Sequence, residues 1–363
     1  MNAIRLSAVL TAALLTGAVS ATALAAEVEP AVLPVTDASI TFKKGISLEN
    51  APGAGGIQGS IAFAVSPAQQ GDLPPTPEDG AQLGTADQIK TGTVTAAFTV
   101  DDTGVANADS DVTVDFDMTK FTTPGVYYYR LTEQDHGITG LSTAPVHLLK
   151  VRVVNANPSD PENTELKIDY AVLAPQAGGD KVDEIENVYT TYGLTVTKQL
   201  AGNFADYGDE FAFTLHFDDP DETAHMASVT VKTGKAGETL ANSAVLKFVD
   251  GKADITETIK GGEVIEVTGL PAGTTYTITE SGTDAANYTT AWTDAAGASL
   301  GEGKALDQQT MPAADTALTV TNTQHKTVEL PAEEDVGGAE EYRNAIWPLY
   351  TNSTGQKLWN GLF

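Results

Sequence analysis

Most of the chain alternates apolar and polar residues in short runs that are separated by turn-forming residues. From about Ser39 to His325 these runs are rich in β-branched and aromatic residues, with Gly, Pro, Asn and Asp between them. Clear examples are residues 93–100, 148–154, 210–217 and 274–279. A period of two is typical of strands with one buried face. Because no long amphipathic helical pattern occurs, the sequence predicts an all-β chain of antiparallel, immunoglobulin-like sandwiches.

The opening of this pattern occurs twice. Residues 40–46 are ITFKKGI and residues 194–200 are LTVTKQL, so each segment alternates apolar residues with polar ones. The alternation places Lys44 in the first segment and Lys198 in the second on the apolar face. Lys43 points to the opposite, outward face. The repeat predicts that the chain is built from two related halves.

Two further polar residues recur in each half. The pattern Y-x-[LI]-x-E ends at Glu133 in the first half and at Glu280 in the second, each time after a turn with Pro and Gly. An asparagine, Asn187 or Asn322, then lies on the apolar face of the last run of each half. Each half therefore carries Lys, Glu and Asn in the same order.

The repeat and the chain ends suggest four segments. Residues 1–25 contain one basic residue, an apolar stretch and the small-x-small pattern Ala23-Leu24-Ala25, which together predict a cleaved export signal. Residues 36–190 and 192–325 form the two expected sandwich domains. Residues 326–363 form a tail. We therefore expect an extracellular protein.

Composition removes several classes of function. The 363 residues include 49 acidic and 20 basic side chains, giving a formal charge of −29, and there is no cysteine. This charge disfavours nucleic-acid binding, and disulfides and thiolate metal sites cannot form. The oxygen-rich segment 107–111 lacks the glycine and the glutamate that a calcium-binding EF loop requires. We expect no cofactor and no bound metal.

Taken singly, the lysine, glutamate and asparagine of each half have ordinary explanations. A lysine near a strand end usually extends to water, and an asparagine there usually caps a turn. The duplicated set on apolar faces favours a chemical role. Burial favours a neutral amine and a neutral carboxyl, so the amine can attack the amide carbon of asparagine while the carboxyl transfers protons. Ammonia leaves, and an isopeptide bond remains.

These residues carry a resemblance to a known family. The two halves resemble the isopeptide-linkage domains of the two-domain backbone pilins of Gram-positive, sortase-assembled pili, of the streptococcal FctA-like type. The resemblance implies one bond from Lys44 to Asn187, with Glu133 as catalyst. It implies a second bond from Lys198 to Asn322, with Glu280 as catalyst. Each bond forms once within its own chain, so the protein is not an enzyme with turnover.

The resemblance also implies a polymer at the cell surface or in the cell wall. A pilin-type sortase would join identical subunits head to tail, with minor pilins or a host receptor as further partners. Lys181, after a Gly-rich turn, resembles the pilus-linking lysine, with Lys150 and Lys167 as rivals. The tail departs from the family: Leu330-Pro331 begins like a sorting motif, but no threonine, glycine and long apolar run follow.

Two other functions are compatible with the same scaffold. An adhesin would bind a host protein or glycan through an exposed aromatic platform, for which residues 288–292 are the candidate unless they pack inward. A hydrolase with paired carboxylates is disfavoured, because Glu133 and Glu280 are separated by a domain-sized stretch of sequence. The structural shaft subunit is the leading hypothesis.

Overall fold

A computed structural model describes residues 32–49, 55–73, 80–160, 162–221, 223–240, 242–282 and 284–325. The expected export signal at 1–25 and the tail at 326–363 lie outside the described residues. None of the helices in the described ranges has the length and apolar character needed to cross a membrane.

The first half of the chain forms two sheets. One has the strand order β5-β1-β9, and the other has the order β4-β2-β6-β7-β8 with β3 paired to β6. The elements are β1 (Ser39–Glu49), β2 (Gly59–Pro67), η1 (Gln70–Asp72), β3 (Ala81–Leu83), η2 (Ala86–Gln88), β4 (Thr93–Phe98), β5 (Asp109–Asp115), η3 (Met118–Lys120), β6 (Gly125–Glu133), β7 (His147–Asn155), β8 (Leu166–Pro175) and β9 (Glu184–Thr190).

The second half also forms two sheets. Their strand orders are β13-β12-β15-β10-β20-β17-β18 and β14-β11-β16-β19. The elements are β10 (Tyr192–Ala201), β11 (Glu210–Asp218), β12 (Ser228–Lys235), β13 (Asn242–Lys247), β14 (Lys252–Lys260), β15 (Glu263–Leu270), β16 (Thr275–Ser281), η4 (Asp284–Asn287), β17 (Thr289–Asp294), β18 (Ser299–Glu302), β19 (Ala305–Thr310) and β20 (Thr316–Thr323).

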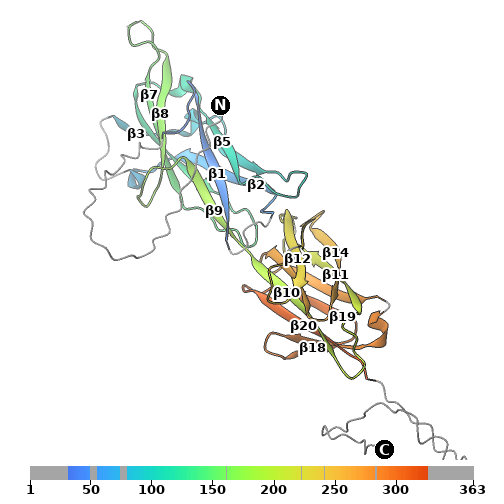
Figure 1. Cartoon of the computed structure of the whole chain (residues 1–363). Helices are drawn as coiled ribbons and strands as arrows, with labels where there is room; N and C mark the ends of the chain where they lie inside the picture. The colour runs from blue at the N-terminus through green and yellow to red at the C-terminus, as the bar shows by residue number, and fades with distance from the viewer. Residues whose placement is uncertain are drawn as a thin grey trace, which may run out of the picture.

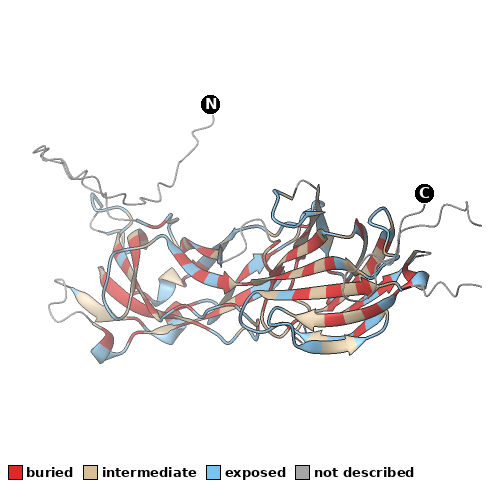
Figure 2. Cartoon of the chain, turned by 60° about the horizontal axis from the view of Figure 1, so that its bottom comes forward, coloured by how far each residue is buried: buried red, intermediate tan, exposed pale blue. Residues whose placement is uncertain are grey.

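Each pair of sheets encloses its own apolar core. Buried and exposed residues alternate along the strands, as Figure 2 shows, because successive side chains point to opposite faces. Edge-to-face aromatic pairs join the two sheets of each half: Phe42 and Phe63 have ring centroids 5.5 Å apart, and Phe213 and Trp292 have centroids 6.3 Å apart. The all-β prediction of two tandem immunoglobulin-like sandwiches is confirmed.

The two sandwiches follow one another along the chain (Figure 1). Only Thr191 separates β9 from β10, and it is fully buried. Side chains also cross the joint: the Asp221 carboxylate accepts hydrogen bonds from Thr139 N at 2.9 Å and from Thr139 Oγ1 at 2.5 Å. Gln58 Nε2 donates to Met226 O at 3.0 Å. The two sandwiches are thus joined by the chain through Thr191 and by side-chain hydrogen bonds.

Candidate functional site

In each sandwich the first strand lies parallel to the last strand of the same half. Strand β1 pairs with β9, which Figure 1 shows side by side, and β10 pairs with β20. Lys44 lies opposite Ile185, two residues before Asn187, in the first pair. Lys198 lies opposite Val320, two residues before Asn322, in the second. Because side chains alternate with a period of two, this register places lysine and asparagine on the same inward face in both halves.

The glutamate of each half comes from the opposing sheet. Glu133 is the last residue of β6 and pairs with Phe63, and Glu280 in β16 pairs with Phe213. Both strands begin beyond a turn, and their inward residues alternate with outward ones. The carboxyl groups therefore reach across the core of the sandwich to the strand pair that carries lysine and asparagine.

The first set of three is buried and in contact. Lys44 and Asn187 have no exposed surface, and Glu133 is 7% exposed. Asn187 Nδ2 donates to Glu133 Oε1 at 2.6 Å, and Lys44 Nζ lies 3.8 Å from Glu133 Oε2. The Lys44 amine also donates to the carbonyls of Gly45 and Ile185, both at 3.1 Å. The structure brings together all three residues that the sequence singles out in this half.

The second set has the same arrangement. Lys198 Nζ lies 3.2 Å from Glu280 Oε1, and Asn322 Nδ2 donates to that oxygen at 2.8 Å. The Lys198 amine also lies 4.3 Å from the centre of the Phe211 ring. Asn187 Oδ1 and Asn322 Oδ1 are buried and have no hydrogen-bond partner among the described residues. Each amide carbonyl is therefore free to accept a hydrogen bond during a reaction.

The electrostatics of both sites favour a nucleophilic amine. Burial lowers the pKa of Lys44 to about 8, against the opposing effect of Glu133. Burial likewise lowers the pKa of Lys198 to about 8, while Glu280 acts to raise it. Near neutral pH a useful fraction of each amine is thus uncharged, although an ordinary lysine is almost fully protonated.

Three neighbours of the glutamates were not found from the sequence. His136 Nε2 lies 3.6 Å from Glu133 Oε1, whereas Lys304 Nζ lies 3.0 Å and Thr290 Oγ1 2.9 Å from Glu280 Oε2. His136 and Lys304 lie outside the strands, where no periodic pattern marks the direction of a side chain. Unlike the lysine, glutamate and asparagine, these three residues are not part of the repeat between the two halves.

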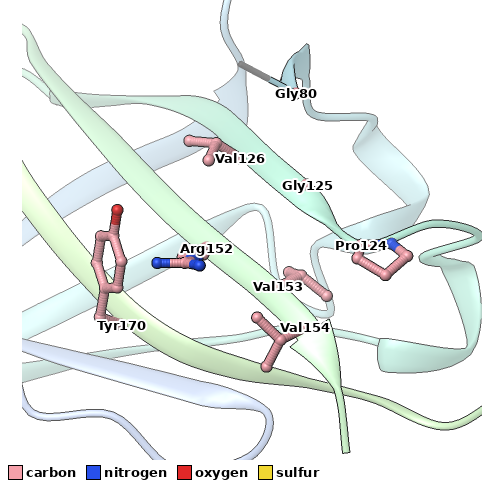
Figure 3. Close-up of a pocket in the computed structure, with 8 residues that line it drawn as sticks. All are labelled: Gly80, Pro124, Gly125, Val126, Arg152, Val153, Val154 and Tyr170. Carbon is pink, nitrogen blue, oxygen red and sulfur yellow. The ribbon is translucent and has the colours of Figure 1, made fainter. Parts of the chain in front are cut away.

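Two of the pockets that the described residues form lie on the first sandwich beside β7 and β8. Figure 3 shows one of about 320 Å³, where the Arg152 guanidinium lies 5.5 Å from the centre of the Tyr170 ring. A second groove of about 670 Å³ contains Lys150 and Lys181 in its lining. Lys181 is exposed, whereas Lys150 and Lys167 are half-buried. None of these lysines contacts the two buried sets in the described structure.

The aromatic platform considered for an adhesin does not exist at residues 288–292. Tyr288 is 5% exposed and Trp292 is fully buried. Tyr288 packs edge-to-face against Phe211, and its hydroxyl donates to Asp209 Oδ2 at 2.7 Å. These rings form part of the core of the second sandwich, as the inward alternative for this segment predicts.

Comparisons with known proteins agree with this geometry. The family model of the Spy0128-like isopeptide containing domain, FctA, matches residues 57–190. A pilin of Streptococcus pyogenes serotype M1 is 28% identical over 259 residues, which is 67% of this chain and 70% of that pilin. The crystal structure of the major pilin from Streptococcus pyogenes is 25% identical with a TM-score of 0.60, covering 80% of this chain and 100% of that one. Residues 57–190 therefore form an FctA-like isopeptide domain, and the two sandwiches together resemble the streptococcal major pilin.

Two further matches concern parts of this chain. Residues 192–325 match a domain of unknown function, DUF7601. A stretch of 92 residues is 41% identical to the pilus tip adhesin Cpa of Streptococcus pyogenes, covering 25% of this chain and 12% of that adhesin. The adhesin match is limited to one domain-sized stretch, whereas the match to the major pilin spans both sandwiches.

Proposed function

We propose that the chain is the backbone subunit of a Gram-positive cell-surface pilus, with each of its two domains closed by an internal isopeptide bond. The observation that carries this proposal is the pair of buried Lys, Glu and Asn sets, which have the same strand register in both halves. The FctA-like domain at residues 57–190 and the likeness to a streptococcal pilin support assembly with further pilin subunits and a place outside the cell.

The contacts of the first site suggest how its bond forms. The uncharged amine of Lys44 attacks the amide carbon of Asn187, and a new C–N bond replaces the bond from that carbon to Nδ2. Glu133 Oε1 accepts a hydrogen bond from Asn187 Nδ2 at 2.6 Å, so it is placed to donate a proton to this nitrogen as the nitrogen leaves. One molecule of ammonia is released, and the spare proton of the amine passes to the carboxyl group.

The second site supports the same reaction. Lys198 and Asn322 both contact Glu280 Oε1, so the carboxyl group lies between the nucleophile and the leaving group. Holding the reactants together in a folded core removes the entropic barrier of a bimolecular reaction. Since lysine and asparagine are consumed, each site reacts once, and the protein is a self-cross-linking structural subunit without turnover.

The intact mass of the purified protein tests the cross-links. We expect a mass below the sequence value by two molecules of ammonia. Lys198→Ala or Glu280→Ala should reduce the deficit to one molecule, and proteolytic peptides should assign the remaining bond to Lys44 and Asn187. An intact mass equal to the sequence value would show that the cross-link proposal is wrong.

Lys181 is the proposed acceptor for polymerisation by a pilin-type sortase. Its amine is exposed beside the groove of about 670 Å³, which offers a surface for an extended peptide from the next subunit. The donor motif expected near Leu330 lies outside the described residues. Cell-wall extracts should show a ladder of detergent-resistant polymers that Lys181→Ala removes and Lys167→Ala leaves intact. Loss of the ladder only in Lys150→Ala or Lys167→Ala would transfer this role to that lysine.

A further inference from the structure

In the second site two lysines, Lys198 and Lys304, contact the Glu280 carboxylate. Lys304 Nζ lies 3.0 Å from Oε2, and Thr290 Oγ1 donates to the same oxygen at 2.9 Å. Lys198 and Asn322 instead contact Oε1. The nucleophile and the leaving group therefore share one oxygen, while Lys304 and Thr290 bind the other.

The backbone around Lys304 is fixed to the strands that build the site. Glu280 N donates to the carbonyl of Lys304 at 2.7 Å, and Gly303 N donates to Thr290 O at 2.8 Å. The indole of Trp292 donates to Gly303 O at 2.9 Å. The Lys304 amine is also held by a hydrogen bond to Ala285 O. Lys304 is thus positioned at Glu280 by both its backbone and its side chain.

The first site has no equivalent of this contact. Glu133 Oε2 is buried and lacks a hydrogen-bond partner within the described ranges. His136 Nε2 lies 3.6 Å from its other oxygen, Oε1. The two sites share the reacting residues and differ in the charge beside the glutamate, so the first serves as a natural reference for the second.

A second cation at Glu280 changes the balance of charge on Lys198. The charged groups that act on the Lys198 amine in the described structure are Glu280 from β16, which favours the ammonium form, and Lys304 beside β19, which disfavours it. Phe211 from β11 and Asn322 from β20 also face this site and carry no charge. The Lys304 side chain is 35% exposed and can stay hydrated, whereas Lys198 is fully buried. Burial therefore favours loss of the proton from Lys198.

We propose that Lys304 is a positioning residue for the second cross-link, which occupies Glu280 Oε2 as a counter-ion and thereby keeps the Lys198 amine in its uncharged, nucleophilic form. This inference rests on the proposed function. Burial by itself lowers the pKa of Lys44 beside Glu133, so at the second site Lys304 adds to the effect of burial. The pKa of Lys198, lowered to about 8 by burial with a contribution from Lys304, agrees with it.

The test follows both bonds in the same molecule. The full chain is kept unfolded in denaturant, refolded by dilution at pH values from about 6 to about 10, quenched and digested, and the loss of ammonia is measured for each half. In the wild type we expect the rate of the second bond to rise with pH to a half-maximum near pH 8, the pKa of Lys198. Because the pKa of Lys44 is also about 8, the rate of the first bond rises with pH in the same way, and comparing that rate between variants at one pH reports folding.

Lys304→Met should raise the pKa of Lys198, because Lys198 is then the only lysine that contacts Glu280 in the described structure. A rise of about one unit would slow the second bond about tenfold at neutral pH, and alkaline pH would restore its rate. Lys304→Arg keeps the charge and should keep the wild-type profile. Thr290→Val removes an uncharged partner of the same oxygen, so the half-maximum should stay near its wild-type pH.

Other outcomes separate the possible failures. An unchanged or faster second bond in Lys304→Met would overturn the role of Lys304, as would an equal slowing at all pH values, which indicates only a structural contribution. Formation of the first bond and circular dichroism show whether Lys304→Met folds. If it does not fold, Lys304→Gln gives the same test, because glutamine keeps a donor for the hydrogen bond to Ala285 O. No ammonia loss from the second half of the wild type would contradict the proposed function itself.

Discussion

The stability supplied by the first cross-link can be measured with a variant that removes the bond and leaves no unpaired buried charge. We choose the double substitution Lys44→Met and Glu133→Gln. Methionine resembles the lysine stem in volume, and the new amide oxygen can still accept the hydrogen bond from Asn187 Nδ2. Because replacing a buried ion pair with neutral residues of similar volume is often nearly neutral, the change in stability reports mainly the lost bond.

The expected magnitude follows from the position of the bond in the chain. Asn187 lies 143 residues after Lys44 (187 minus 44). The entropy of closing a loop of that length in the unfolded chain corresponds to about 5 kcal/mol at room temperature. For a domain of about 150 residues, each kcal/mol shifts the melting temperature by about 2–4 °C, so we expect a decrease of about 10–20 °C.

Differential scanning calorimetry of the wild type and the double variant measures this shift, and intact mass verifies that one bond is missing. The matched control is Lys43→Met, one residue away on the outward face, where Lys43 forms a half-exposed ion pair with Asp109 at 2.6 Å. Because water screens that pair, its loss should change the melting temperature little. If the double variant lacks the bond and still melts within about 3 °C of the wild type, the entropic reasoning is refuted.

Two further predictions concern other parts of the two cores. Burial lowers the pKa of His147 below 6.5, against a hydrogen bond with Pro145 O, so the unfolded chain binds a proton more readily than the folded one. The stability from neutral His147 is therefore complete above about pH 6.5 and declines as the pH falls toward the folded pKa. From about pH 7.5 to about pH 5.5, the urea midpoint should decrease more in the wild type than in His147→Gln. Equal decreases in the two proteins would contradict this assignment. Trp292→Ala should lower the stability of the second domain by about 3–5 kcal/mol, since the side chain is fully buried. Trp292→Phe, which loses the hydrogen bond to Gly303 O but keeps an aromatic ring, should cost clearly less in the same urea titration. Equal losses in the two variants would show that the aromatic ring contributes little through its packing.

The reacting residues could be found from the sequence because strands have a strict period. Lys44 and Lys198 each interrupt an apolar row at a position that must face inward, and the second copy of the pattern excludes chance. The parallel pairing of first and last strands was not predicted, because the alternation favoured antiparallel sandwiches and the resemblance implied only which residues are bonded. Strand order depends on contacts between distant residues, which alternation within one strand does not encode.

The surroundings of the sites could not be found in this way. Lys304 follows Gly303 at the end of a turn. Its direction is set by the hydrogen bonds from Glu280 N to Lys304 O and from Gly303 N to Thr290 O, which exist only in the folded sandwich. His136 lies just beyond the end of β6 and turns back to Glu133. Both residues have the sequence context of ordinary surface loops, so their roles became visible only in three dimensions.

The single residue between β9 and β10 has a mechanical consequence. With the second isopeptide bond formed, a tensile load that enters at the proposed acceptor Lys181 runs along β9, continues through Thr191 into β10, crosses the bond to β20 and leaves there. Along this path the load runs through short, already extended strands and covalent bonds, and the remaining strands of each sandwich are not stretched. Under tension such a subunit would behave as an inextensible link, so any elasticity of the filament must arise between subunits.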